Sequence, residues 1–148
     1  MKKRLIIIIV AFIISAVFIY FITEPKQEKW SYNLLPNNYA IKKTSDTDVI
    51  LGKYVDGLFE VEVDGRKIGI EDYVAEFSYG KNYISLKCLE STTDGVIVKF
   101  YIIDSQNEKI YGPYETEETY NAVLEKIVDE ELNDWIETIK KPNGAINK

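Results

Sequence analysis

An uncharged apolar run near the amino terminus constrains this chain more than any other feature of its sequence. Residues 5–22 carry no charged side chain and directly follow three basic residues, Lys2, Lys3 and Arg4. At about 1.5 Å per residue, a helix of this length reaches roughly 27 Å, close to the hydrocarbon thickness of a bilayer. Basic flanks stay in the cytoplasm. The sequence therefore predicts a single-pass anchor over residues 1–22, with the remainder of the chain outside the cell membrane.

A cleaved signal peptide is the competing interpretation of this segment. The apolar region of such a peptide usually has about 7–15 residues and ends at a small-x-small site. Here the run is longer and ends in Tyr20, Phe21 and Ile22. These features favour an uncleaved anchor, although sequence alone leaves open whether the segment is removed in the cell.

Charge and missing residue types narrow the functions open to the rest of the chain. Beyond the anchor, 15 basic residues face 24 acidic ones, a net charge of −9. This balance argues against nucleic acid and anionic lipid surfaces, and leaves a protein partner with a basic surface. The chain has no histidine, which removes Ser–His and Cys–His dyads and the commonest transition-metal ligand. We expect no cofactor, no bound metal and a buried, unreactive Cys88.

Alternation of apolar and polar residues predicts a series of hairpins. A turn at Asp64-Gly65 would pair Val63 with Arg66, Val61 with Ile68 and Phe59 with Ile70, and place Glu62 opposite Lys67. A turn at Gly80-Lys81 would pair Phe77 with Ile84 and Ala75 with Leu86. A third hairpin is expected after the apolar strand "VIVKFYIID". Its turn would begin at Asp104 and place Asn107 in the left-handed conformation, and its second strand would end at Pro113. A further strand pair is expected at about 39–43 and 48–54.

After the last hairpin the apolar residues recur every three or four positions, from Tyr120 through Trp135 to Ile139, which indicates the apolar face of a helix. Thr116 can cap its start, and Lys140 and Lys141 close it before Pro142. The predicted fold is α+β: an antiparallel β-meander of about six strands covered by this C-terminal amphipathic helix. The expected divisions are a linker at 23–38, an extracytoplasmic domain at 39–141 and a flexible tail at 142–148. An open sheet and a partly closed barrel both remain possible.

Acidic side chains on the predicted helix are the first candidate for a binding surface. Glu130 and Asp134 would lie four residues apart on one face beside Glu131, where unpaired acids repel one another. A basic partner would relieve that repulsion, and Tyr111 and Tyr114 are suited to an interface. The plainer interpretation of the acids is a solvated helix face.

A second acidic set lies on one strand, where Glu60, Glu62 and Asp64 could offer oxygen ligands to Ca²⁺. Because Glu62 is expected to face Lys67, a solvated strand face is the favoured interpretation of this set.

The stretch "FYIIDSQNEKIYGPYETEETY" resembles the carboxy-terminal motif of a small family of cell-envelope proteins, commonly lipoproteins, of low-GC Gram-positive bacteria. Their shared domain has no known function. The matching positions are Tyr101, Ile103, Asp104, Tyr111, Gly112, Pro113, Glu117 and Glu118. Leu35 to Tyr39 approximates an early motif of that family, and Tyr73 to Tyr83 resembles its middle strand pair. The resemblance implies an exported location and a small β-rich fold, but no catalytic residues. The lack of a lipid-accepting cysteine favours the membrane helix.

These features together predict a membrane-anchored extracytoplasmic domain that binds without catalysis. The favoured ligand is another protein, as for an accessory subunit or an immunity protein. The alternative is a small-molecule or cell-wall ligand held in a tyrosine-lined groove, which a concave aromatic pocket would favour. A carboxylate-dependent hydrolase, the least favoured option, would require two carboxyl groups converging in a cleft.

Overall fold

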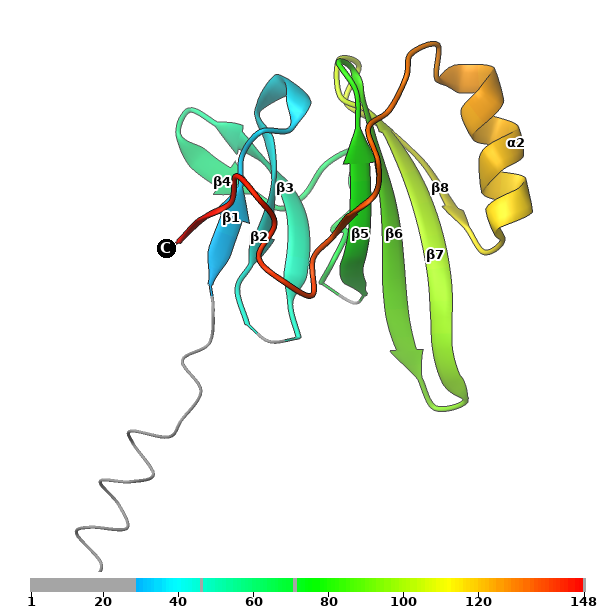
Figure 1. Ribbon diagram of the computed structural model, residues 1–148, viewed down its shortest axis with the longest axis horizontal. Helices are drawn as coiled ribbons and strands as arrows, with labels where there is room; N and C mark the ends of the chain where they lie inside the picture. The colour runs from blue at the N-terminus through cyan, green and yellow to red at the C-terminus, as the bar shows by residue number, and fades with distance from the viewer. Residues whose placement is uncertain (1–28, 46, 71, 148) are drawn as a thin grey trace, which may run out of the picture.

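The structure of the protein, a computed structural model, describes residues 29–45, 47–70 and 72–147. Within them the chain forms two five-stranded antiparallel sheets and one α-helix, which confirms the expected α+β class (Figure 1). The single meander of about six strands is not found, because the strands divide between two sheets. The expected transmembrane segment, residues 5–22, lies outside this part of the chain. No helix in the described ranges is long and apolar enough to cross a membrane.

Each sheet combines a four-strand meander with one short strand contributed by the C-terminal segment. The first sheet has the order β10-β1-β2-β3-β4 and the second β8-β7-β6-β5-β9. The first contains β1 (Trp30–Tyr32), β2 (Tyr39–Lys43), β3 (Val49–Val55), β4 (Leu58–Glu60) and β10 (Ile146–Asn147), with a 3₁₀ turn η1 (Pro36–Asn38) before β2. The second contains β5 (Tyr73–Tyr79), β6 (Tyr83–Thr92), β7 (Gly95–Asp104), β8 (Lys109–Tyr114) and β9 (Ile136–Glu137). Helix α2 spans Glu117–Ile127.

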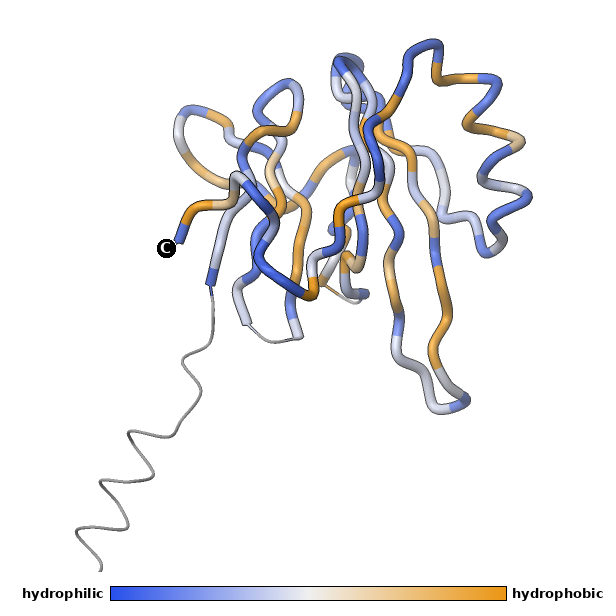
Figure 2. The backbone as a smooth tube through the Cα atoms, viewed as in Figure 1, coloured by the Kyte–Doolittle hydropathy of each residue, from blue (hydrophilic) through white to orange (hydrophobic). Residues whose placement is uncertain are grey.

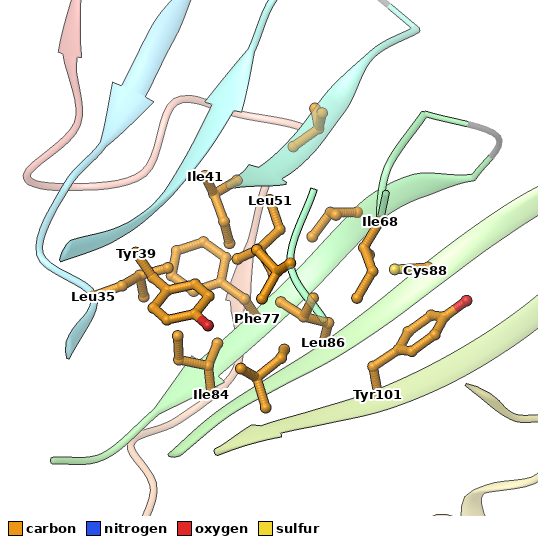
Figure 3. Close-up of a cluster of buried hydrophobic side chains, with 14 of the residues drawn as sticks. Leu35, Tyr39, Ile41, Leu51, Ile68, Phe77, Ile84, Leu86, Cys88 and Tyr101 are labelled. Carbon is orange, nitrogen blue, oxygen red and sulfur yellow. The ribbon is translucent and has the colours of Figure 1, made fainter. Parts of the chain in front are cut away.

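Large apolar side chains from both sheets meet in one core (Figure 3). Ile41 and Leu51 of the first sheet and Phe77 and Leu86 of the second are almost completely buried there. Burying each such side chain stabilises the fold by about 1.5–3 kcal/mol. Cys88 is buried in the same core, as expected, and burial raises the pKa of its thiol. Because strand residues alternate between faces, the next residues along these strands point away from this core.

The Asp64-Gly65 turn forms as predicted, but the long hairpin around it does not. Both residues have positive φ angles, as a type I′ turn requires, and Val63 pairs with Arg66. Phe59 pairs with Tyr54 instead of Ile70. An earlier turn at Asp56-Gly57, also with positive φ angles, sends β4 back along β3 and removes Phe59 from the predicted hairpin.

The same turn covers the free edge of the second sheet. An Asp64 carboxylate oxygen accepts a hydrogen bond from the Ile110 amide at 3.0 Å, and Arg66 donates to the Gly112 carbonyl. Both of these backbone groups belong to β8, the edge strand. The turn therefore satisfies backbone groups that would otherwise attract another strand.

The hairpin of β5 and β6 exists with its pairing shifted by two residues. Phe77 lies opposite Leu86 rather than Ile84, and the Gly80 amide donates to the Tyr83 carbonyl at 2.9 Å. The loop therefore has two residues, as predicted, but they follow Gly80 instead of including it. Alternation fixes which face a side chain occupies, and a shift of two preserves every face. A bulge between Val74 and Glu76 accompanies the change.

The hairpin of β7 and β8 differs from its prediction only at the turn and at its end. Asp104 begins the turn as expected and accepts the Asn107 amide at 3.0 Å. The left-handed residue is Glu108, not Asn107, because the turn has one residue more than expected. Strand β8 continues through Pro113 to Tyr114. This is compatible with proline, because β8 is an edge strand.

Helix α2 begins as predicted and ends much earlier. The Thr116 hydroxyl accepts the Thr119 amide at 3.2 Å and caps the helix, and Glu117 lies in the first turn. The helix ends at Ile127 rather than near Lys141. The apolar residues beyond it recur at helical spacing, but residues 128–135 form neither helix nor strand and lead into β9.

The predicted linker and the predicted flexible tail both contribute to the first sheet. The predicted linker, 23–38, contains β1, whose Trp30 is 1% exposed. In the predicted tail, 142–148, Pro142 is buried and β10 pairs with β1 through Ser31 and Ile146. The folded domain therefore extends past both predicted boundaries, because the first sheet gains strand partners and core side chains from these segments.

Candidate binding groove

A groove lies on the outer face of the second sheet, between α2 and residues 130–135. We call it the outer groove. It consists of two hollows of about 330 and 480 Å³, both lined by Tyr120, Asn121 and Trp135. Helix α2 packs on β7 and β8 (Figure 1). The outer face of β5 and β6 is therefore bordered by the helix on one side and the returning chain on the other.

Tyr120 anchors the groove to the sheet. Its hydroxyl donates to the Ser85 hydroxyl at 2.9 Å, and its ring stacks on Phe100 with centroids 5.0 Å apart. Tyr120 is 3% exposed, and this burial raises the pKa of its phenol. It therefore stays neutral at physiological pH and serves as a rigid hydrogen-bonded wall.

Glu130 fixes the first part of the returning chain to the β5–β6 turn. One carboxylate oxygen accepts the amides of Asn82 at 2.7 Å and Tyr83 at 3.0 Å. Glycine at position 80 leaves room for this approach, because a Cβ there would lie 2.5 Å from the Glu130 carboxylate and displace it. The carboxylate thus satisfies two backbone donors at the end of the hairpin.

Asn133 fixes the next part of this segment to β5. Its amide donates to the Tyr79 carbonyl at 3.0 Å, and its side-chain oxygen accepts the Tyr79 amide at 2.8 Å. The Ser78 hydroxyl donates to the Asn133 carbonyl at 2.6 Å. These bonds hold the groove wall in a defined position beside the sheet.

Trp135 is the exposed aromatic side chain of the groove. It is 41% exposed, and its ring centroid lies 6.3 Å from that of Tyr120. Beside it, Glu76 and Lys87 form an ion pair of 2.8 Å across β5 and β6. The larger hollow therefore combines aromatic walls with a polar floor that already contains one neutralised pair.

Negative charge is concentrated around the groove. Residues 115–137 contain nine acidic side chains and a single basic one, Lys126, for a net charge of −8. Four of these acids line the groove itself, namely Glu115, Glu117, Glu125 and Glu130. Such a concave surface focuses a negative potential and attracts cationic groups.

The residues proposed from sequence as a partner-binding set take several different positions. Glu131 and Asp134 are exposed beside the groove, whereas Glu130 is half-buried and bonded to the hairpin. The predicted helical acidic face does not exist, because these residues lie beyond the end of α2. Tyr111 and Tyr114 are half-buried and pack against the cluster beneath the helix.

The second acidic set also has structural partners. Glu62 lies 3.8 Å from Lys67, as expected, and Asp64 accepts the Ile110 amide. Among the described residues, no group of three or more acidic, histidine or cysteine side chains could hold a metal ion.

Sequence patterns alone missed the aromatic part of the groove. Tyr120 and Trp135 were both expected on the apolar face of one long helix. The signal against that helix was the run Leu132-Asn133-Asp134, because Asn and Asp are poor helix formers that bond to nearby backbone. Phe100 and Lys87 carried no such signal, since their outward position depends on how two sheets share the core.

No family model, curated protein or solved structure matches this chain. The shape and charge of the outer groove therefore carry the assignment of function.

Proposed function

We propose that this protein is a membrane-anchored extracytoplasmic domain that binds, without catalysis, a basic segment of another protein in its outer groove. The supporting observation is the net charge of −8 over residues 115–137, gathered around an exposed tryptophan. The anchor is the apolar segment 5–22. An accessory subunit or an immunity protein would have this organisation.

Charge complementarity favours a basic partner over an acidic or neutral one. Lys and Arg side chains reaching the groove would meet the exposed carboxylates of Glu131 and Asp134 at its rim. The exposed aromatic ring of Trp135 also attracts cations, most strongly where water is excluded. An acidic segment would instead meet like charges, which costs several kcal/mol at an interface.

A cell-wall ligand is the second candidate, and the shape of the groove favours it. Exposed Trp135 borders both hollows beside Asn121, so a sugar ring could stack on the indole while its hydroxyls bond to the amide. A ligand of this kind needs the aromatic side chain more than the surrounding charge.

Crosslinking in intact cells separates these candidates. Wild type is compared with a Glu131→Lys, Asp134→Lys variant, and a Glu60→Lys, Glu62→Lys variant with the same charge change, placed away from the groove, is the control. We expect one protein with a basic segment to be recovered by wild type and control. Recovery by the groove variant should fall about tenfold, as for a loss of roughly 1.4 kcal/mol.

Equal recovery by all three chains would contradict the basic-partner proposal. Trp135→Ala then tests the second candidate: loss of binding to cell-wall fragments by this variant, but not by the charge variants, would favour a glycan ligand.

A further inference from the structure

The hairpin of β6 and β7 extends past the strands on either side of it (Figure 1). These two strands pair with each other as far as Thr92 and Gly95. The pairing of β8 reaches only Phe100 of β7, and that of β5 only Leu89 of β6. We call residues 90–99 the arm. On its β8 side, residues 95–99 have no neighbouring strand within the part of the chain that the structure describes.

The arm is apolar on both faces near its tip. Val96 is 63% and Ile97 is 41% exposed. Since successive side chains alternate, Val96 and Val98 share one face and Ile97 occupies the other. Figure 2 shows the hydrophobic residues of β7 continuing down to the end of the arm. Two charged residues flank this edge: Asp94 lies at the tip, and Lys99 is bound to Glu90 within the same hairpin at 2.5 Å.

We propose that the arm is a homodimer interface, in which residues 95–99 pair antiparallel with the same residues of a second copy. Exposed strand edges offer unpaired amides and carbonyls that another strand can satisfy. The order Val-Ile-Val reads the same in both directions. Pairing centred on Ile97 therefore places Val96 opposite Val98 of the second copy and Ile97 opposite its counterpart, as a two-fold symmetric contact requires.

A second copy fits this edge better than a lipid surface does. A lipid surface would satisfy the exposed valines and isoleucine, but it would leave the backbone groups of the edge without partners. The free edge is therefore the observation that favours a strand over a membrane.

Dimerisation would affect ligand binding whatever ligand the outer groove holds. The two-fold axis of such a pair stands perpendicular to the sheet, so both outer faces point the same way. Val98 and Phe100 of β7 line the larger hollow of the groove. A dimer would thus present two grooves side by side, suited to a partner with repeated basic segments.

Disulfide trapping of the full chain in membranes tests this pairing. Ile97→Cys places thiols of two copies directly opposite each other, and Leu58→Cys, on an edge strand of the first sheet and 71% exposed, is the matched control. Under mild oxidation we expect Ile97→Cys to form a covalent dimer about tenfold faster than the control, because pairing raises the effective thiol concentration. Adding Val96→Asp should abolish that advantage, and circular dichroism checks that each variant is folded.

Equal crosslinking of Ile97→Cys and Leu58→Cys would overturn the proposal. An environment-sensitive dye attached to the introduced thiol of the Ile97→Cys variant provides a second readout. If the dye reports insertion into phosphatidylcholine vesicles and no covalent dimer forms, the proposal is also overturned and the arm is assigned to the membrane.

Discussion

Glu130 connects the groove wall to the second sheet, and replacing it with alanine should loosen both. The substitution removes the acceptor of the Asn82 and Tyr83 amides. A hydrogen bond to a charged group contributes about 1.5–3 kcal/mol when the group is well buried. Glu130 is only half-buried, so water can replace part of each bond. We expect Glu130→Ala to lower the free energy of unfolding by about 2 kcal/mol in total.

Urea denaturation of the full chain measures this loss, with Glu131→Ala as the control. Glu131 is exposed on the same segment, and its substitution should change stability by no more than about 0.5 kcal/mol. Glu130→Gln keeps an acceptor oxygen and should fall between the two. Hydrogen exchange gives a local measure, since the Asn82 and Tyr83 amides should exchange faster in Glu130→Ala.

Equal stability of Glu130→Ala and Glu131→Ala, with unchanged exchange at these two amides, would refute the reasoning. The groove wall would then be held by the Asn133 contacts alone.

Further predictions concern buried polar groups. Tyr120→Phe removes the donor to the Ser85 hydroxyl, so it should lower the free energy of unfolding by about 1 kcal/mol and weaken ligand binding. Urea denaturation measures the first effect and ligand titration the second. Unchanged stability would contradict the role of this bond. The fully buried Thr138 hydroxyl lies 2.5 Å from the Val74 carbonyl, so Thr138→Val should cost about 1–2 kcal/mol and speed local opening of β9 in hydrogen exchange. Burial, reinforced by nearby carboxylates, raises the pKa of Tyr39 to about 12. Because the folded state holds this proton more tightly than the unfolded state does, the free energy of unfolding is highest below pH 10 and falls as the pH rises towards 12. The loss amounts to about 2–3 kcal/mol. The Tyr39 hydroxyl is buried with no hydrogen-bond partner among the described residues. Tyr39→Phe should therefore be as stable as wild type near neutral pH, and more stable than wild type above the ordinary pKa of tyrosine. Urea denaturation at both pH values checks this.

Local signals predicted several strand positions and faces of this fold, one turn and the start of the helix. Strands at 39–43 and 49–55, the Asp64-Gly65 turn and the Thr116 cap each follow from a few adjacent residues. Alternation also placed Phe77 on the correct face, although its partner is Leu86 instead of Ile84. Parity determines a face, but it does not choose between registers that differ by two residues.

Contacts between residues far apart in the sequence could not be predicted from the same patterns. Trp30 lies in a segment with linker composition, and it becomes a strand residue only because two sheets bury it. The residues after α2 continue a helical spacing, yet Asn133 gains more by bonding to both backbone groups of Tyr79. The outer groove depends on this early end of the helix. Its acidic residues were therefore predictable in part, whereas its shape and its aromatic wall were not.

Photocrosslinking from the groove tests the binding proposal most directly. A photoreactive phenylalanine analogue replaces Trp135 in the full chain in intact cells, and the same analogue at Leu58 serves as the control. We expect position 135 alone to capture one protein, through a segment rich in lysine and arginine that mass spectrometry can identify. Equal capture from both positions, or capture from position 135 through an acidic segment, would contradict the outer groove as a site for a basic partner.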